Sequence, residues 1–92
     1  MMKRYKFSIK IPAWINVLAY LDKSNKVNTI ASISRDNALT YTHTLYMIKE
    51  LEKIRVLKSV KDGRSRLISL TNKGKLIAEH CYKIQEFVRI QI

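Results

Sequence analysis

The sequence has little cysteine, proline or glycine, and these shortages exclude several classes of protein. Its single cysteine, Cys81, excludes an intrachain disulfide and a zinc site built from several cysteines. We interpret Cys81 as a small buried apolar side chain rather than as a redox group. No apolar run approaches the roughly 18 residues of a membrane-spanning helix, and the N-terminal sequence lacks the apolar core of a secretory signal. We therefore expect a cytoplasmic protein, or one in the host cytoplasm if the chain is viral.

The residue patterns that catalysis or metal binding requires are also missing. The sequence has two histidines, His43 and His80. His80 adjoins Cys81, whereas a metal site or a nucleophile and base on one helix require a spacing of about four residues. No glycine-rich loop that could bind a phosphate is present. We therefore predict no enzymatic activity, no cofactor and no metal site.

Acidic residues are few, and positive charge is in large excess. Seven aspartates and glutamates stand against 18 lysines and arginines, which gives a formal net charge of +11. Such a charge favours a polyanionic partner, either nucleic acid or an anionic membrane surface. The length of 92 residues fits one small domain, and the hydrophobic fraction of 47% argues against a disordered chain. We therefore expect a single domain over residues 1–92.

The spacing of apolar residues predicts the N-terminal elements. Residues 3–11 alternate between polar and apolar side chains, which is typical of a strand but also fits an extended arm. The apolar members of this segment are Tyr5, Phe7, Ile9 and Ile11. Pro12 suits the first turn of a helix over about residues 12–22. The apolar face of that helix would carry Trp14, Val17, Leu18 and Leu21.

Two further helices are predicted between residues 28 and 54. Asn28 or Thr29 can cap a short second helix, whose apolar residues are Ile30, Ala31 and Ile33. A third helix over about residues 39–54 has Thr40 as a possible cap. Its apolar stripe consists of Leu45, Ile48 and Leu51, with Thr44 close by.

A hairpin and a last helix complete the predicted fold. Asp62-Gly63 is a strong turn signal between strands over about residues 57–61 and 65–70. Thr71-Asn72 can then cap a helix over about residues 73–92. Three helices, a basic hairpin over residues 56–71 and a terminal helix describe a winged helix-turn-helix. The predicted fold class is therefore α+β, mostly α.

The run from Leu51 to Lys75 resembles a segment of MarR-type transcriptional regulators. In that family a Leu-Glu pair ends the recognition helix, an Asp-x-Arg turn forms the tip of the wing, and Leu-Thr-x-x-Gly opens the next helix. This chain has Arg55 where many members have glycine between helix and wing, and it is shorter than typical members. It more closely resembles the compact winged-helix regulators of archaea and their viruses. The matching positions are Leu51, Glu52, Asp62, Arg64, Leu70, Thr71 and Gly74.

This arrangement predicts a sequence-preferring regulator that binds double-stranded DNA. The third helix would enter the major groove, and the wing tip would lie at the minor groove or the DNA backbone, with the Asp62 carboxylate positioning Arg64. Residues of the second helix and its flanks would bind phosphates, although Asn28 and Thr29 suit capping equally well. The alternatives are that Tyr41 or Tyr46 is half buried against the first helix and that the wing tip is a solvated loop. The candidate DNA-binding residues are Asn28, Thr29, Ser34, Arg35, Thr40, Tyr41, Thr42, His43, Tyr46, Lys49, Lys61, Arg64 and Arg66.

The terminal helix carries a wide apolar stripe that predicts a homodimer. Packing against the first helix, with Tyr5 or Phe7, is the alternative within one chain. The predicted interface residues are Ile77, Cys81, Ile84, Phe87 and Val88.

Two other functions fit parts of the pattern. A nonspecific nucleic-acid-binding protein, chromatin-like or RNA-binding, shares the positive charge but predicts little sequence preference. A winged-helix protein-interaction module shares the fold but needs no such charge. The sequence gives no indication of a small-molecule effector or of the operator. It also does not indicate whether the protein represses or activates transcription.

Overall fold

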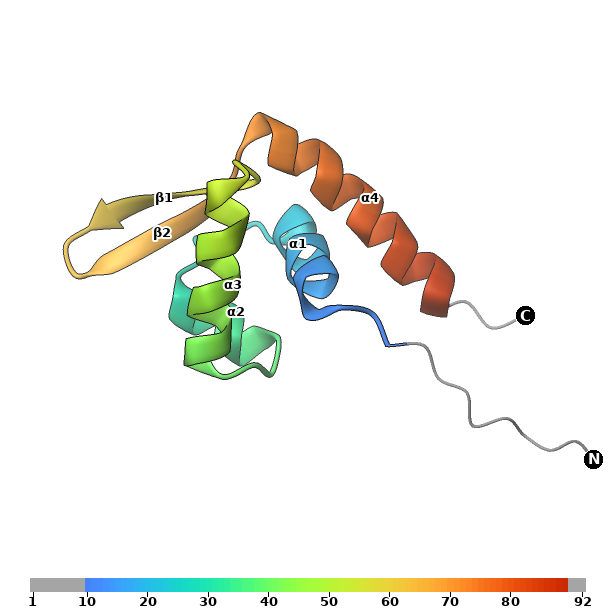
Figure 1. Ribbon diagram of the computed structural model, residues 1–92, viewed down its shortest axis with the longest axis horizontal. Helices are drawn as coiled ribbons and strands as arrows, with labels where there is room; N and C mark the ends of the chain where they lie inside the picture. Colours follow the sequence, from blue (N-terminus) through green and yellow to red (C-terminus); the bar gives the residue numbers. More distant parts are fainter. Residues whose placement is uncertain (1–9, 90–92) are drawn as a thin grey trace, which may run out of the picture.

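The computed structural model describes residues 10–89, so the strand or arm predicted over residues 1–9 lies outside the described residues, as do residues 90–92. Along the chain follow α1 (Ala13–Lys23), α2 (Ile30–Asp36), α3 (Tyr41–Lys53), β1 (Leu57–Asp62), β2 (Ser65–Leu70) and α4 (Asn72–Arg89). The hairpin projects beside α3, and α4 lies on the far side of α1 (Figure 1). The predicted α+β, mostly helical, winged fold is confirmed. None of the helices in residues 10–89 combines the length and the apolar character needed to cross a membrane.

The helix starts follow from local hydrogen bonds that the sequence predicts. Thr29 Oγ1 accepts a hydrogen bond from the Ser32 amide at 3.2 Å, and Ser32 Oγ accepts one from the Thr29 amide at 2.9 Å. This reciprocal capping box opens α2. Thr40 Oγ1 accepts from the His43 amide at 3.1 Å and opens α3. Pro12 is the cap residue of α1 and not part of its first turn, so the helix begins one residue later than predicted.

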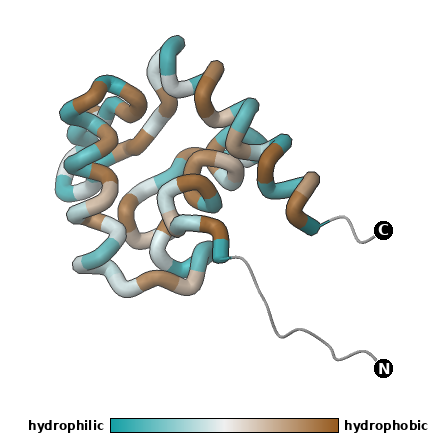
Figure 2. The backbone as a smooth tube through the Cα atoms, turned by 45° about the vertical axis from the view of Figure 1, so that its right-hand side comes forward, coloured by the Kyte–Doolittle hydropathy of each residue, from teal (hydrophilic) through white to brown (hydrophobic). Residues whose placement is uncertain are grey.

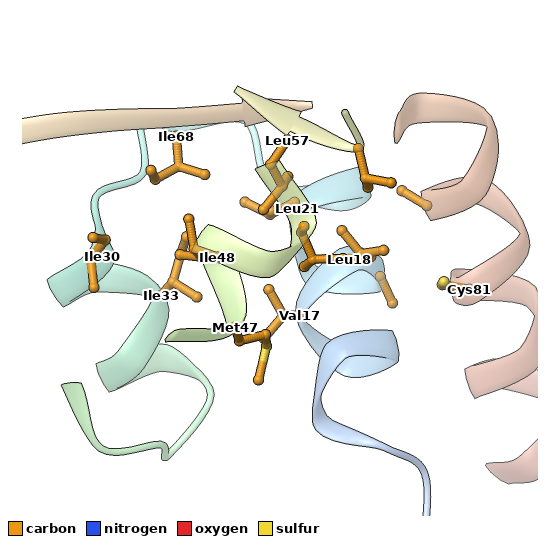
Figure 3. Packing of buried hydrophobic residues seen from close by; sticks show 14 residues of the cluster. Val17, Leu18, Leu21, Ile30, Ile33, Met47, Ile48, Leu57, Ile68 and Cys81 are labelled. Carbon is orange, nitrogen blue, oxygen red and sulfur yellow. The ribbon is translucent and has the colours of Figure 1, made fainter. Parts of the chain in front are cut away.

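In the core, α1 lies between α4 on one side and α3, α2 and the hairpin on the other, and it packs most closely against α4 (Figures 1 and 3). The predicted apolar faces of α1, α2 and α3 supply seven of the core's 14 buried residues within residues 10–89. Trp14 is an exception to the prediction, because its side chain is 42% exposed. It lies in the first turn of α1, at the rim of a groove beside α3 rather than within the core. The most deeply buried large side chains are Leu18, Ile33, Ile48, Leu57, Val17 and Val56.

The link from α3 to the hairpin takes the backbone form for which glycine is usual. Arg55 has a φ of +63°, in the left-handed region. Its amide donates to the Glu52 carbonyl at 3.0 Å, and the Val56 amide donates to the Leu51 carbonyl at 2.9 Å. These two bonds form a Schellman motif, in which the left-handed position is commonly glycine. Arg55 therefore keeps the backbone turn despite its side chain.

The start of α4 crosses this link at very close range. The Thr71 amide donates to the Val56 carbonyl at 3.1 Å, and the Thr71 hydroxyl donates to the Arg55 carbonyl at 2.6 Å. Thr71 Oγ1 also accepts from the Gly74 amide at 2.9 Å, which caps α4. A Cβ atom on Gly74 would overlap the Val56 carbonyl. In the Leu-Thr-x-x-Gly pattern, Thr71 therefore caps α4, and Gly74 allows the backbone of α4 to approach the Val56 carbonyl closely.

The hairpin turn is displaced by one residue from the prediction. The antiparallel register pairs Leu57 with Leu70 and Asp62 with Ser65, so the two turn residues are Gly63 and Arg64. Gly63 has a φ of +63°, as the first position of a tight two-residue turn requires. Asp62 is therefore the last residue of β1 rather than part of the turn. On the other edge of the hairpin, the Ile68 amide donates to the Asn28 carbonyl at 2.8 Å.

A polar cluster joins the end of α1, the following loop and α2. Asn28 is 4% exposed, and its side chain donates to Ser24 Oγ at 2.9 Å and accepts from Ser32 Oγ at 3.1 Å. The Tyr20 hydroxyl lies 2.8 Å from Asn28 Oδ1 and 2.6 Å from Asp36 Oδ2. Asn28 therefore fixes the loop between the two helices.

The same cluster makes stability depend on acid pH through Asp36. Hydrogen bonds from Lys26, at 2.7 Å, and from Tyr20 lower the pKa of Asp36 to about 2, from about 4 in an unfolded chain. Because the folded-state pKa is the lower one, this stabilisation is complete above about pH 4 and is lost as the pH falls through about 2.

The thermal midpoint should therefore fall less on acidification in Asp36→Asn than in the parent chain. The matched variant Asp62→Asn, whose carboxylate has no ion pair within residues 10–89, should behave as the parent. An identical acid response in all three proteins would contradict this assignment.

Candidate nucleic-acid interface

The outward face of α3 carries polar and aromatic side chains. Thr44, Met47, Ile48 and Leu51 are buried on the opposite face. The helical repeat places three of the predicted residues, at positions 42, 46 and 49, on one exposed stripe. Tyr41 and Tyr46 are 55% and 65% exposed, so neither is half buried against the core. The stripe consists of Thr42, Tyr46 and Lys49.

A cleft lies between this helix and the hairpin. It has a volume of about 510 Å³ and an apolar floor that includes Ile48 and Ile68. Four of the predicted cationic residues line it, and so do the predicted residues Thr29 and Tyr41. The structure therefore brings α3 and the hairpin together on one basic surface. The four cations are Lys49, Lys61, Arg64 and Arg66.

The arginines of the hairpin are held differently from the prediction. Arg66 Nη1 donates to Ser59 Oγ at 2.7 Å, across the two strands, which fixes its guanidinium beside the cleft. Arg64 occupies the turn, and within residues 10–89 no ion pair joins it to Asp62. The prediction that Asp62 positions Arg64 is therefore wrong, because Asp62 is paired in the strand while Arg64 is in the turn.

The residues predicted around α2 divide into exposed and buried groups. Ser34 is 6% exposed, and its hydroxyl donates to the Ile30 carbonyl at 2.7 Å. Ser34 and the buried Asn28 therefore do not reach the surface, and the prediction that they contact phosphate is wrong. Thr29 is half buried and lines the cleft while it caps α2. Arg35 is exposed, 3.3 Å from the Asp36 carboxylate, and lies outside the cleft.

The remaining residues predicted on α3 lie at its start and on its other flank. Thr40 is exposed and caps the helix. His43 and Tyr46 line a second groove, on the side of α3 that faces Trp14. Tyr46 thus belongs both to the outward stripe and to the rim of this groove.

Three polar residues of the cleft were missed by the sequence analysis as binding candidates. Glu52 is half buried in the cleft and contributes its one acidic side chain. Its spacing of three residues from Lys49 would have placed both on one side of the helix. Ser59 and Ser65 come from the hairpin, where strand alternation alone could not show which side faces α3.

The predicted interface on α4 is only partly exposed. Cys81 is 3% exposed and lies on the side of α4 that faces α1 (Figure 3), and Ile77 is partly buried against the core. The prediction that these two residues form an interface with a second chain is therefore wrong. Burial also raises the pKa of the Cys81 thiol, which disfavours its reactive thiolate. Ile84, Phe87 and Val88 are 45%, 74% and 45% exposed. Apolar positions recur along α4 to its C-terminal half (Figure 2).

Residues 15–74 match a family model described as a winged helix DNA-binding domain. Three solved structures illustrate the likeness. The protein AF1382 from Archaeoglobus fulgidus is 20% identical with a TM-score of 0.76, covering 84% of this chain and 88% of AF1382. MepR, a transcription regulator of the Staphylococcus aureus multidrug efflux pump MepA, is 21% identical with a TM-score of 0.72, covering 82% of this chain and 57% of MepR. A MepR variant bound to an oligodeoxyribonucleotide is 20% identical with a TM-score of 0.71, covering 82% of this chain and 57% of the variant.

These likenesses concern the fold. This chain spans less than two thirds of the length of either MepR chain. Among curated protein sequences, none matches it significantly.

Proposed function

The chain belongs to the winged helix DNA-binding domain family. We propose that it is a transcriptional regulator that binds double-stranded DNA with a preference for certain sequences. The observation that carries this proposal is the basic cleft between α3 and the hairpin, where three cations of the hairpin lie beside Lys49 of the exposed stripe. A phosphate backbone neutralises such a surface, and the net charge of +11 favours the same partner. The proposal includes no catalytic activity, cofactor or metal, and it places the protein in the cytoplasm of its cell or viral host.

In this proposal α3 lies in the major groove, which is wide enough to admit one helix. Tyr46 would contact thymine methyl groups, Thr42 would donate or accept at base edges, and Lys49 would reach a guanine edge or a phosphate. The sequence of α3 contains no arginine, asparagine or glutamine, the residues that read guanine or adenine with two hydrogen bonds. Base readout is therefore moderate, and DNA shape contributes to specificity.

The hairpin is proposed to bind beside the helix, with Arg64 at its tip directed to a narrow minor groove or to the backbone. Replacing Arg64 by alanine should weaken binding to the preferred site by about 1–3 kcal/mol. Fluorescence anisotropy with a labelled duplex at constant salt measures this change. The matched control is Lys83→Ala, which removes one exposed positive charge from α4, away from the cleft. Equal losses in both variants would mean that only net charge matters and would remove the wing from the mechanism.

Dimerisation through α4 is the second part of the proposal. Ile84, Phe87 and Val88 are exposed near one end of α4, and a group of exposed apolar side chains often marks a partner surface. Two-fold symmetry would present two α3 helices to major grooves about 34 Å apart. Sedimentation at micromolar concentration should show a dimer for the parent chain and a monomer for Phe87→Asp. A monomeric parent chain would reject this part of the proposal.

Selection of bound duplexes from a random oligonucleotide pool tests the proposed function. We expect a recurring site with two related halves about one helical turn apart. The selected duplex should then compete far better than random DNA of the same length. Equal competition by random DNA would favour the nonspecific nucleic-acid-binding alternative, and absence of any binding would favour a protein-interaction module.

A further inference from the structure

A second groove lies on the flank of α3 opposite the hairpin and shares only Tyr46 with the proposed DNA contact. It has a volume of about 550 Å³ and separates the first turn of α1 from α3. Three large side chains are exposed around it, since Trp14, Tyr46 and Ile54 are 42%, 65% and 55% exposed. Such a gathering differs from the single exposed apolar residues of ordinary surfaces. The groove is lined by Ala13, Trp14, His43, Tyr46, Met47, Glu50, Leu51 and Ile54.

We propose that this groove is the docking site for the chain's own N-terminal segment, residues 1–9. The segment joins the described chain at Lys10, three residues before Ala13, which is itself part of the groove. Along α3 the groove runs from His43 to Ile54, or roughly 17 Å at the rise of an α-helix. Nine extended residues reach about 30 Å, so the segment is long enough to cover it.

The side-chain pattern of the segment suits a surface that is apolar on one side and open to water on the other. Tyr5, Phe7 and Ile9 alternate with polar residues at positions 4, 6 and 8. The same phase is present where the described chain begins, because Ile11 is half buried and Lys10 is exposed. In an extended segment of this phase, the three apolar side chains lie on the side that faces the groove.

Tethering and charge both favour this occupant over a second copy of the chain. A short tether holds its segment at an effective concentration of about a millimolar, well above the micromolar concentrations at which a second copy competes. Glu50 lies at the groove, with 48% of its side chain exposed, and it is 3.0 Å from the Lys53 ammonium. Lys3, Arg4 and Lys6 of the segment would bring further positive charge close to this carboxylate.

Docking has a consequence for DNA binding, which rests on the proposed function. The outward side chains Arg4 and Lys6 would lie beside Tyr46, on the flank of α3 opposite the hairpin. The helix would then have cations on both sides, and the segment would extend the phosphate contacts. The docking itself needs no DNA and is tested without it.

The chain has one tryptophan, Trp14, and it reports directly on the groove. We compare its emission and its quenching by acrylamide in the parent chain and in Phe7→Ser. The matched control is Ser8→Ala, which changes the outward side of the same segment without changing its charge. Docking predicts that Phe7→Ser shifts the emission to longer wavelength and increases quenching, while Ser8→Ala leaves both unchanged. Far-ultraviolet circular dichroism and thermal unfolding verify that all three proteins are folded.

Dilution distinguishes the segment from a second copy. If the segment covers Trp14, the quenching of the parent chain is the same at every protein concentration. An increase in quenching on dilution would show that a second copy covers the groove and would overturn the proposal. Equal quenching in the parent chain and Phe7→Ser would show that the segment does not shield Trp14, and this too would overturn it. Neither result would affect the DNA-binding proposal, because no DNA is present.

Discussion

Replacing Gly74 by alanine should lower the free energy of unfolding by about 3 kcal/mol, the largest loss that we expect from one methyl group in this chain. The added Cβ atom would overlap the Val56 carbonyl and lie 3.2 Å from Thr71 Oγ1. Val56 has no room to retreat, because its amide is bonded to the Leu51 carbonyl and its carbonyl to the Thr71 amide. Urea unfolding at neutral pH measures the loss.

The matched control for this clash is Gly63→Ala in the hairpin turn. A Cβ atom at Gly63 would meet no atom within 4 Å beyond the glycine itself and its two chain neighbours, so only its φ of +63° is unfavourable. That conformation costs an ordinary residue about 1–2 kcal/mol. If Gly74→Ala destabilised the protein no more than Gly63→Ala, the close crossing of α4 over the α3–β1 link would be wrong.

Binding to DNA should weaken steeply as salt is added. The cleft holds four cations, so the proposed dimer would have eight available for phosphates, four from each of its two clefts. A protein with 6–10 phosphate contacts loses roughly 10³–10⁵ in affinity between 50 and 200 mM salt, because bound counterions are released. Anisotropy titrations with one duplex at several salt concentrations measure the slope. A flat profile would exclude the electrostatic contact that the cleft is proposed to make.

Features that depend on neighbouring residues were predictable from the sequence. Thr29 and Thr40 cap their helices through amides three residues away, and the Gly63 turn joins two adjacent strands. The resemblance around Leu51–Lys75 also gave the start of α4 correctly. Each of these signals acts over a few residues, so spacing and residue type are sufficient.

Features that depend on packing between distant segments were not predictable in the same way. Asn28 looks like a surface cap, but bonds that include Tyr20, eight residues away, hold it in the interior. The apolar stripe of α4 was recognised, yet its division into the buried Cys81 and the exposed Phe87 depends on how α4 crosses α1. The groove beside Trp14 likewise depends on how the first turn of α1 lies beside α3.

The central claim is that one surface, formed by the outward stripe of α3 and the cations of the hairpin, contacts DNA. Mapping backbone amide shifts by NMR as the selected duplex is added tests it most directly. The titration is carried out at a protein concentration where the oligomeric state of the protein stays constant. We expect the largest shifts in residues 41–49 and 61–66, and no shifts on the exposed face of α4. Shifts concentrated on α4, or on the Tyr20–Asn28–Asp36 cluster, with the cleft between α3 and the hairpin unchanged, would contradict the claim.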